Sequence, residues 1–82
     1  MATIMEKESL IDLIAYAKSI ISLRMEHSEQ YEELARFLAR KRRWVYATPH
    51  EEIDLDSEVK PLQEIIKKYK GLPLLPQFQK NA

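Results

Sequence analysis

The side chains in this sequence that are best suited to chemistry are the cations and aromatic rings between Arg36 and Tyr46. This segment reads RFLARKRRWVY and contains no acid. Guanidinium and ammonium groups bind phosphates and carboxylates, and neighbouring aromatic rings can stack on bases. The segment therefore predicts contact with an acidic protein surface or with nucleic acid, although the pattern is also typical of a solvated helix end. The candidate binding residues are Arg36, Arg40, Lys41, Arg42, Arg43, Trp44 and Tyr46.

The spacing of these residues indicates how they share the surface of a helix. Residues three and four apart lie on the same side of a helix, so Arg36, Arg40 and Arg43 should share one face. The same spacing places the Arg40 guanidinium over the Trp44 indole, which contributes about 0.5–1 kcal/mol at an exposed site. We therefore expect a positive helix face with an aromatic residue at its edge.

A group of acids follows the basic segment, at Glu51, Glu52, Asp54, Asp56 and Glu58. These acids are expected to pair with the cations from Arg40 to Arg43 or to remain solvated. The spacing after Asp54 is superficially similar to a calcium loop, but Val59 stands where an EF-hand needs its glycine. Because the net charge is zero, this separation into blocks indicates a surface that orients a charged partner.

The remaining residue types argue against catalysis. The chain has no cysteine and a single glycine, so neither a thiolate metal site nor a glycine-rich phosphate loop is expected. His27 and His50 are isolated, and His50 lacks the second histidine of the zinc motif HExxH. We expect a protein that is not an enzyme and that binds neither a metal ion nor a cofactor.

Apolar residues recur at spacings of three and four along the first half of the chain, which predicts helical structure. No glycine or proline interrupts residues 1–48, so this half fits either one long helix or two helices folded as a hairpin. His27 and Ser28 interrupt the apolar stripe, and Ser28 suits the N-cap of a second helix. We favour the hairpin, with helices over about 6–26 and 29–47, because a short chain must fold back to bury its stripe.

A third helix is predicted over about 58–70, after a loop from Thr48 to Ser57. Pro61 is expected only near the start of this helix, and Gly71 is expected at the position that follows its C-terminus. The predicted fold class is all-α: a small helical hairpin or a long helix, a third short helix, and an extended apolar C-terminal tail.

The tail over residues 71–82 reads GLPLLPQFQKNA, and its prolines favour an extended path. Its large apolar side chains must be covered, either by the helices of the same chain or by the groove of a partner. Both alternatives stay open, and we favour the partner. The candidate docking residues of the tail are Leu72, Pro73, Leu74, Leu75, Pro76 and Phe78.

The length of 82 residues predicts a single small helical domain over residues 1–82. No apolar run is long enough to cross a bilayer, and the first residues lack the pattern of a signal peptide. We therefore expect a cytoplasmic protein without a membrane partner. The abundance of charged residues and the scarcity of asparagine are typical of proteins from hyperthermophiles.

These observations lead to three hypotheses about function. The first is a non-catalytic accessory subunit or adaptor that docks on a larger intracellular protein, which could belong to a replication or transcription assembly. The first alternative is a small regulatory protein that binds DNA or RNA directly through the basic-aromatic helix face. The second alternative is a helical homodimer in which the apolar stripe becomes buried on self-assembly.

Overall fold

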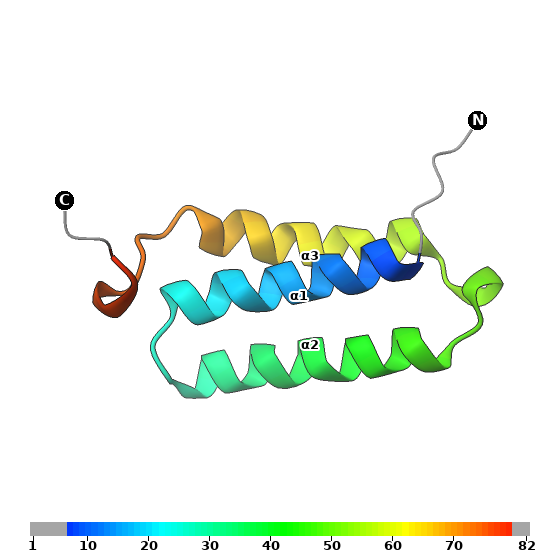
Figure 1. The fold of residues 1–82 in the computed structure, drawn as a ribbon, viewed down its shortest axis with the longest axis horizontal. Coiled ribbons are helices and arrows are strands. Elements are labelled where there is room, and N and C mark those ends of the chain that lie inside the picture. The colour runs from blue at the N-terminus through cyan, green and yellow to red at the C-terminus, as the bar shows by residue number, and fades with distance from the viewer. Residues whose placement is uncertain (1–6, 80–82) are drawn as a thin grey trace.

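The computed structural model describes residues 7–79, and this part of the chain contains helices and no strand. The all-α fold class predicted from the sequence is confirmed. The predicted start of the first helix at Glu6 and residues 80–82 of the tail lie outside the described residues. In chain order the elements are α1 (Lys7–Arg24), α2 (Glu29–Ala47), the 3₁₀-helix η1 (His50–Glu52), α3 (Leu55–Lys70) and the 3₁₀-helix η2 (Pro76–Phe78) (Figure 1).

The first two helices form a hairpin that turns at His27 and Ser28, as predicted. Ser28 has extended backbone angles, φ −146° and ψ 168°, and its hydroxyl oxygen accepts a hydrogen bond from the Tyr31 N–H. This cap satisfies one of the N–H groups that a helix N-terminus leaves unpaired. The bounds of α2 agree with the prediction, whereas α1 ends at Arg24 rather than near residue 26.

The third helix begins at Leu55, earlier than the predicted start near Glu58. Its N-cap is Asp54, whose carboxylate accepts hydrogen bonds from the Ser57 hydroxyl at 2.8 Å and from the Ser57 N–H at 3.3 Å. These two bonds favour the charged carboxylate and lower the pKa of Asp54 below its ordinary value. The carboxylate also complements the positive end of the helix dipole. Asp54 is therefore a better N-cap than Ser57, the last residue of the predicted loop.

One prediction about α3 is wrong, that for Pro61, whereas Gly71 directly follows the last helical residue, as predicted. Pro61 lies in the second turn rather than near the start, and its ring is exposed. The helix continues through it with one backbone hydrogen bond missing, since proline has no N–H to donate. Gly71 is the C-cap with right-handed angles, φ −75° and ψ −10°, so it does not adopt the left-handed conformation expected after a helix.

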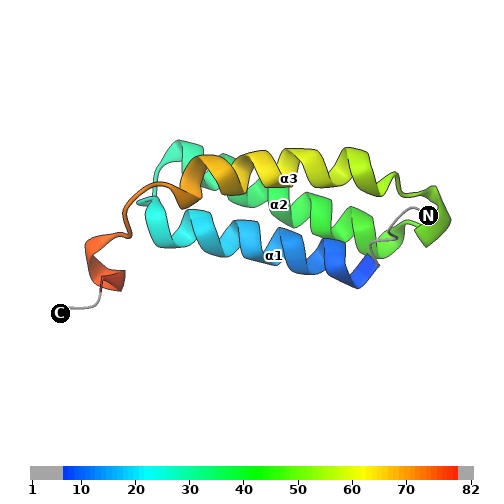
Figure 2. The same ribbon diagram turned by 90° about the horizontal axis from the view of Figure 1, so that it is seen from above.

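The three helices lie side by side along the long axis of the molecule, and α1 packs against both α2 and α3 (Figures 1 and 2). A broad apolar stripe lets one helix contact two neighbours. Accordingly, α1 supplies half of the core. The buried core residues are Leu10, Ile14, Ala17, Ile20 and Ile21 from α1, Leu38 and Val45 from α2, Ile53 from the loop, and Leu62 and Tyr69 from α3.

Lys7 links the beginning of α1 to the end of α2. Its ammonium group donates hydrogen bonds to the carbonyl oxygens of Tyr46 at 3.2 Å and Thr48 at 2.7 Å. These carbonyls belong to the C-terminal end of α2, where a cation also complements the helix dipole. The contact therefore helps to hold the two helices antiparallel and level with each other.

The C-terminal tail is attached to α1 by hydrogen bonds. The Leu75 N–H donates to the carbonyl oxygen of Leu23 at 2.9 Å, and Arg24 Nε donates to that of Leu72 at 2.9 Å. The last carbonyls of a helix have no partner within the helix, so Leu23 is free to accept this bond. The prolines of the tail have no N–H group to donate, but Leu75 has one and makes this bond. Pro76 begins η2, so the extended path ends at Leu75.

Candidate functional site

The seven candidate residues of the basic segment are spread around α2. Arg36, Arg40 and Arg43 keep the spacing of one helix face, because α2 is a continuous α-helix, and Arg36 and Arg40 line a shallow hollow of about 550 Å³ together with Phe37. Arg43 also lines a different hollow, with Arg42 and residues of α1. Consecutive helical positions are rotated by about 100°, so a run of adjacent cations is spread around the helix. The candidate residues therefore belong to separate surfaces.

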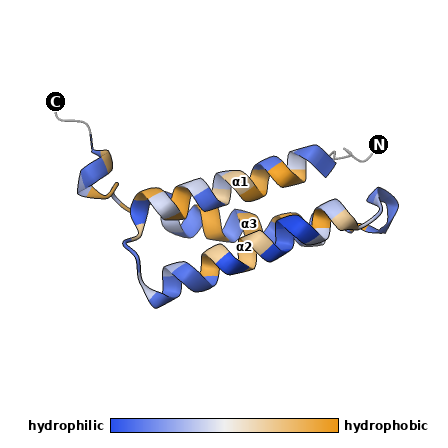
Figure 3. Cartoon of the chain, turned by 60° about the horizontal axis from the view of Figure 1, so that its bottom comes forward, coloured by the Kyte–Doolittle hydropathy of each residue, from blue (hydrophilic) through white to orange (hydrophobic). Residues whose placement is uncertain are grey.

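A groove of about 880 Å³ lies between α1 and α2. We call it the α1–α2 groove. None of its lining residues belongs to α3, which lies behind the other two helices in the view of Figure 3. The core residues Ile14 and Leu38 form its floor. The lining residues are Ile14, Ala15, Lys18, Ser19, Ser22, Leu38, Ala39, Arg42, Arg43 and Tyr46.

Small side chains create the groove. Ala15 and Ser19 on α1 and Ala39 on α2 are exposed beside the buried floor. These side chains extend only one or two atoms beyond the backbone, so they cannot fill the angle between two helices that larger core residues hold apart. On the opposite side of the helix pair, α3 covers this angle. The groove thus follows from the order of small and large residues on α1 and α2.

The rim of the groove is positively charged. Lys18, Arg42 and Arg43 are exposed, and no carboxylate is among the lining residues. None of the three cations forms an ion pair within residues 7–79. Since no neighbouring acid neutralises them there, their potential attracts anionic groups to the groove. Sequence reasoning missed Lys18, because it lies outside the basic segment; its position four residues after Ile14 was the available signal.

Tyr46 completes the rim beside Arg42. The guanidinium carbon of Arg42 lies 5.5 Å from the centre of the Tyr46 ring, a cation–π arrangement. The contact nevertheless leaves 59% of the tyrosine exposed. Tyrosine and arginine are among the residue types that contribute most often to the centres of protein interfaces. The rim therefore offers both charge and apolar area to a partner.

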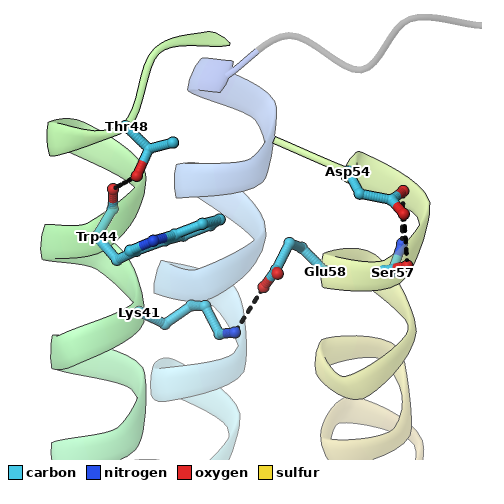
Figure 4. Close-up of polar contacts among 6 residues, drawn as sticks. All are labelled: Lys41, Trp44, Thr48, Asp54, Ser57 and Glu58. Carbon is cyan, nitrogen blue, oxygen red and sulfur yellow. Dashed lines mark hydrogen bonds and ion pairs between the residues drawn. The ribbon is translucent and has the colours of Figure 1, made fainter. Parts of the chain in front are cut away.

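The side of α2 near α3 carries a different arrangement, shown in Figure 4. Lys41 Nζ is 2.5 Å from a Glu58 carboxylate oxygen, and it lies 5.4 Å and 5.7 Å from the ring centres of Phe37 and Trp44. The expected stacking of Arg40 on Trp44 is therefore wrong, because Glu58 draws the Lys41 ammonium into that position. The pairing of Lys41 with Glu58 confirms that an acid after the basic segment pairs with it. It also partly neutralises Lys41.

The tail lines a further hollow, of about 430 Å³, at the hairpin end of the molecule. Leu75 and Phe78 line it together with residues of α1, α2 and the turn between them. Ser22 lines both this hollow and the α1–α2 groove, so the two are adjacent. Leu72 and Phe78 remain 44% and 42% exposed. The tail thus covers part of its own domain and presents the rest of its apolar surface to solvent.

Other kinds of site are not found in residues 7–79. No three histidine, cysteine or acidic residues in this range are grouped so that they could hold a metal ion. His27 packs edge-on against the Tyr31 ring, with 5.0 Å between the ring centres. Among the same residues, no helix has the length and apolar character that crossing a membrane requires.

No protein-family model matches this sequence, and no curated protein or solved structure shows a significant match to it. The α1–α2 groove and the adjacent tail are therefore the features from which a function can be inferred.

Proposed function

We propose that this protein is a non-catalytic docking module, an accessory subunit or adaptor that binds a protein partner through the α1–α2 groove. The observation that carries the proposal is a groove in which the exposed small residues Ala15 and Ala39 lie beside the buried core and are surrounded by exposed cations and Tyr46. Protein interfaces combine an apolar centre with a polar rim in this way. The groove is open along the helices, which suits a macromolecular surface better than a small molecule, since small molecules are usually enclosed.

The chemistry of the lining supports a binding function. Ser19 and Ser22 are the only hydroxyl groups of the lining apart from that of Tyr46, and the lining holds no histidine or carboxylate that could activate them as nucleophiles. The Ser22 hydroxyl donates a hydrogen bond to the Ser19 carbonyl oxygen at 3.1 Å, as is common in helices. The groove therefore has groups that attract and orient a partner and none arranged for general-base catalysis.

The distribution of charge favours a protein partner over nucleic acid. Domains that bind nucleic acid usually have a continuous basic surface and a basic overall charge. This chain has a net charge of zero, and Arg36 and Arg40 are not among the residues that line the groove with Arg42 and Arg43. We therefore treat direct nucleic-acid binding and homodimer formation as the alternative outcomes of the test.

The test adds the same bulk inside and outside the groove. Ala39→Trp fills the α1–α2 groove, whereas Ala47→Trp adds an identical side chain at an exposed position outside its lining. The tagged wild-type chain and both variants are used to capture partners from extracts of the source cells, with and without nuclease treatment. We expect wild type and Ala47→Trp to retain one stoichiometric protein partner, and Ala39→Trp to bind it at least about 10-fold more weakly.

Equal binding by all three forms would contradict the proposal. Capture that disappears after nuclease treatment would favour the nucleic-acid alternative instead. A homodimer that Ala39→Trp dissociates in sedimentation equilibrium would favour self-assembly. Circular dichroism of each variant should show unchanged helix content, because both substitutions are at exposed positions.

A further inference from the structure

We infer that the segment of the partner that occupies the α1–α2 groove is an acidic amphipathic helix, which packs across α1 and α2 as a fourth helix. The inference rests on the proposed docking function and specifies the partner of the same site. Three features of the molecule support it: the shape of the groove, the position of its cations and its continuation toward the tail.

The shape of the groove favours a helix. Two antiparallel helices leave a seam into which the ridge of side chains of a third helix fits. The exposed small residues Ala15 and Ala39 leave room for apolar side chains of such a helix to pack in the groove, beside the buried Ile14 and Leu38. An extended peptide would place unpaired backbone N–H and C=O groups against this apolar floor, and the described residues include no sheet edge to pair with them.

The cations on the rim specify the charge of this helix. Lys18 lies one turn after Ile14 on α1, and Arg42 lies one turn after Leu38 on α2. Because the two helices are antiparallel, these cations lie toward opposite ends of the floor, about 11 Å apart along the groove at 5.4 Å per turn. Acids separated by about two turns, roughly seven residues, on the flanks of an apolar stripe would reach both. Such complementarity raises the association rate and excludes basic partners.

The tail extends the apolar surface at one end of the groove. Ser22 connects the groove to the hollow in which Phe78 lies, and Phe78 is 42% exposed. A partner helix about as long as α1, which has 18 residues, would reach this end. We therefore expect an apolar residue at that end of the partner helix to contact Phe78. The tail and the groove would then act as one docking surface.

Designed peptides test the inference directly, because they carry the expected chemistry of the partner helix. The first probe is a fluorescent amphipathic peptide of about 18 residues with leucines on one face and glutamates flanking them about seven residues apart. A second peptide has lysines in place of the glutamates, and a third has the residues of the first in scrambled order. Fluorescence anisotropy measures the binding of each peptide to the full chain, and circular dichroism reports whether the peptide becomes helical.

We expect the glutamate peptide to bind as a helix at least about 10-fold more tightly than the other two. Arg42→Glu combined with Arg43→Glu should weaken its binding at least about 10-fold, whereas Arg36→Glu with Arg40→Glu should change it less than about 2-fold. The second pair is a matched control, because it makes the same change of charge on the same helix. The milder pair Arg42→Gln and Arg43→Gln should give an intermediate loss.

Each other outcome overturns a specific statement. If the glutamate and lysine peptides bind equally and Ala39→Trp blocks both, the groove is a docking site but its partner is not selected by acidic charge. If Ala39→Trp does not weaken the glutamate peptide, the groove is not the site, and the proposed function fails as well. If the glutamate peptide does not bind or binds without becoming helical, the inference is wrong, while the capture experiment still decides the proposed function.

Discussion

Single residues set the helix boundaries of this domain through two caps of different chemistry. Ser28 begins α2 with a hydroxyl group, and Asp54 begins α3 with a carboxylate. Each accepts a hydrogen bond from the N–H group three residues later, which the helix itself leaves without a partner. The cap at Ser28 is decisive, because the apolar stripe continues in phase through this position and would also fit one long helix.

Replacement of Ser28 by alanine should destabilise the domain by about 1 kcal/mol, because the Tyr31 N–H loses its acceptor. In a domain of this size, that change lowers the melting temperature by roughly 4–8 °C. Ser9→Ala, at an exposed position within α1, is the matched control and should shift the melting temperature by no more than about half as much. Equal melting temperatures of the two variants would show that the Ser28 cap does not stabilise the turn.

Asp54 should make stability depend on pH. Its pKa is lowered in the folded chain by the hydrogen bonds of Ser57, so its contribution is present above the ordinary pKa of 3.8. That contribution is lost as the pH falls through the lowered value of the folded state. The free energy of unfolding is measured with urea at neutral pH and at about pH 3. Between these two pH values, it should therefore fall less in Asp54→Asn than in wild type. Asp12→Asn is the control for removal of one exposed acid, and identical pH profiles of both variants would refute the expectation.

Among the structural elements, the tail departs most from its expected role. Of the two coverings that the sequence left open, we favoured a partner, and the tail is hydrogen-bonded to the last turn of α1 at Leu23 and Arg24. Leu74 and Leu75 are half-buried, whereas Leu72 and Phe78 remain exposed. The tail is therefore partly a cover for its own domain, and its docking role stays a prediction.

Truncation after Gly71 should lower the melting temperature by roughly 5–10 °C. Half-burial of two leucines contributes on the order of 1–2 kcal/mol after the cost of ordering the segment is subtracted, which corresponds to a shift of this size in a small domain. Truncation after Gln79 keeps the contacts described for the tail and is the control for the longer truncation. An unchanged melting temperature after the longer truncation, with loss of the partner, would show that the tail is only a docking peptide.

The molecule as a whole depends on α1, which contacts both other helices and supplies half of the core. With 82 residues, the chain buries a modest core, so each fully buried side chain is a large part of the total stability. The small number of helices also explains the open groove. In the described part of the chain, α3 is the only helix that can cover the α1–α2 pair. One side of the pair is therefore left to solvent or to a partner.

Leu62→Ala should destabilise the domain by about 2–5 kcal/mol, because Leu62 is completely buried where α3 joins the core. Leu72→Ala is the matched control: the same atoms are removed from a residue that is 44% exposed, so the loss should be below about 1 kcal/mol. Urea unfolding followed by circular dichroism compares the two. Similar losses would mean that α3 is not anchored by the core as the structure indicates.

The sequence by itself determined the features that depend on near neighbours. The spacing of apolar residues predicted helices, and Ser28 predicted where α2 begins, since a cap acts within about four residues. The start of α3 was missed because the acids after His50 read as a solvated loop. The cap at Asp54 is also a local signal, and the hydroxyl of Ser57 three residues later could have revealed it.

The tertiary structure decided which of these residues meet. Lys18 reaches the same groove as Arg42 and Arg43 only because the buried faces of α1 and α2 fix the rotation of each helix about its axis. The attachment of Leu75 to Leu23 likewise depends on where α3 ends relative to α1. These relations join residues far apart in the chain, and they are set by the burial of a shared core rather than by any local pattern.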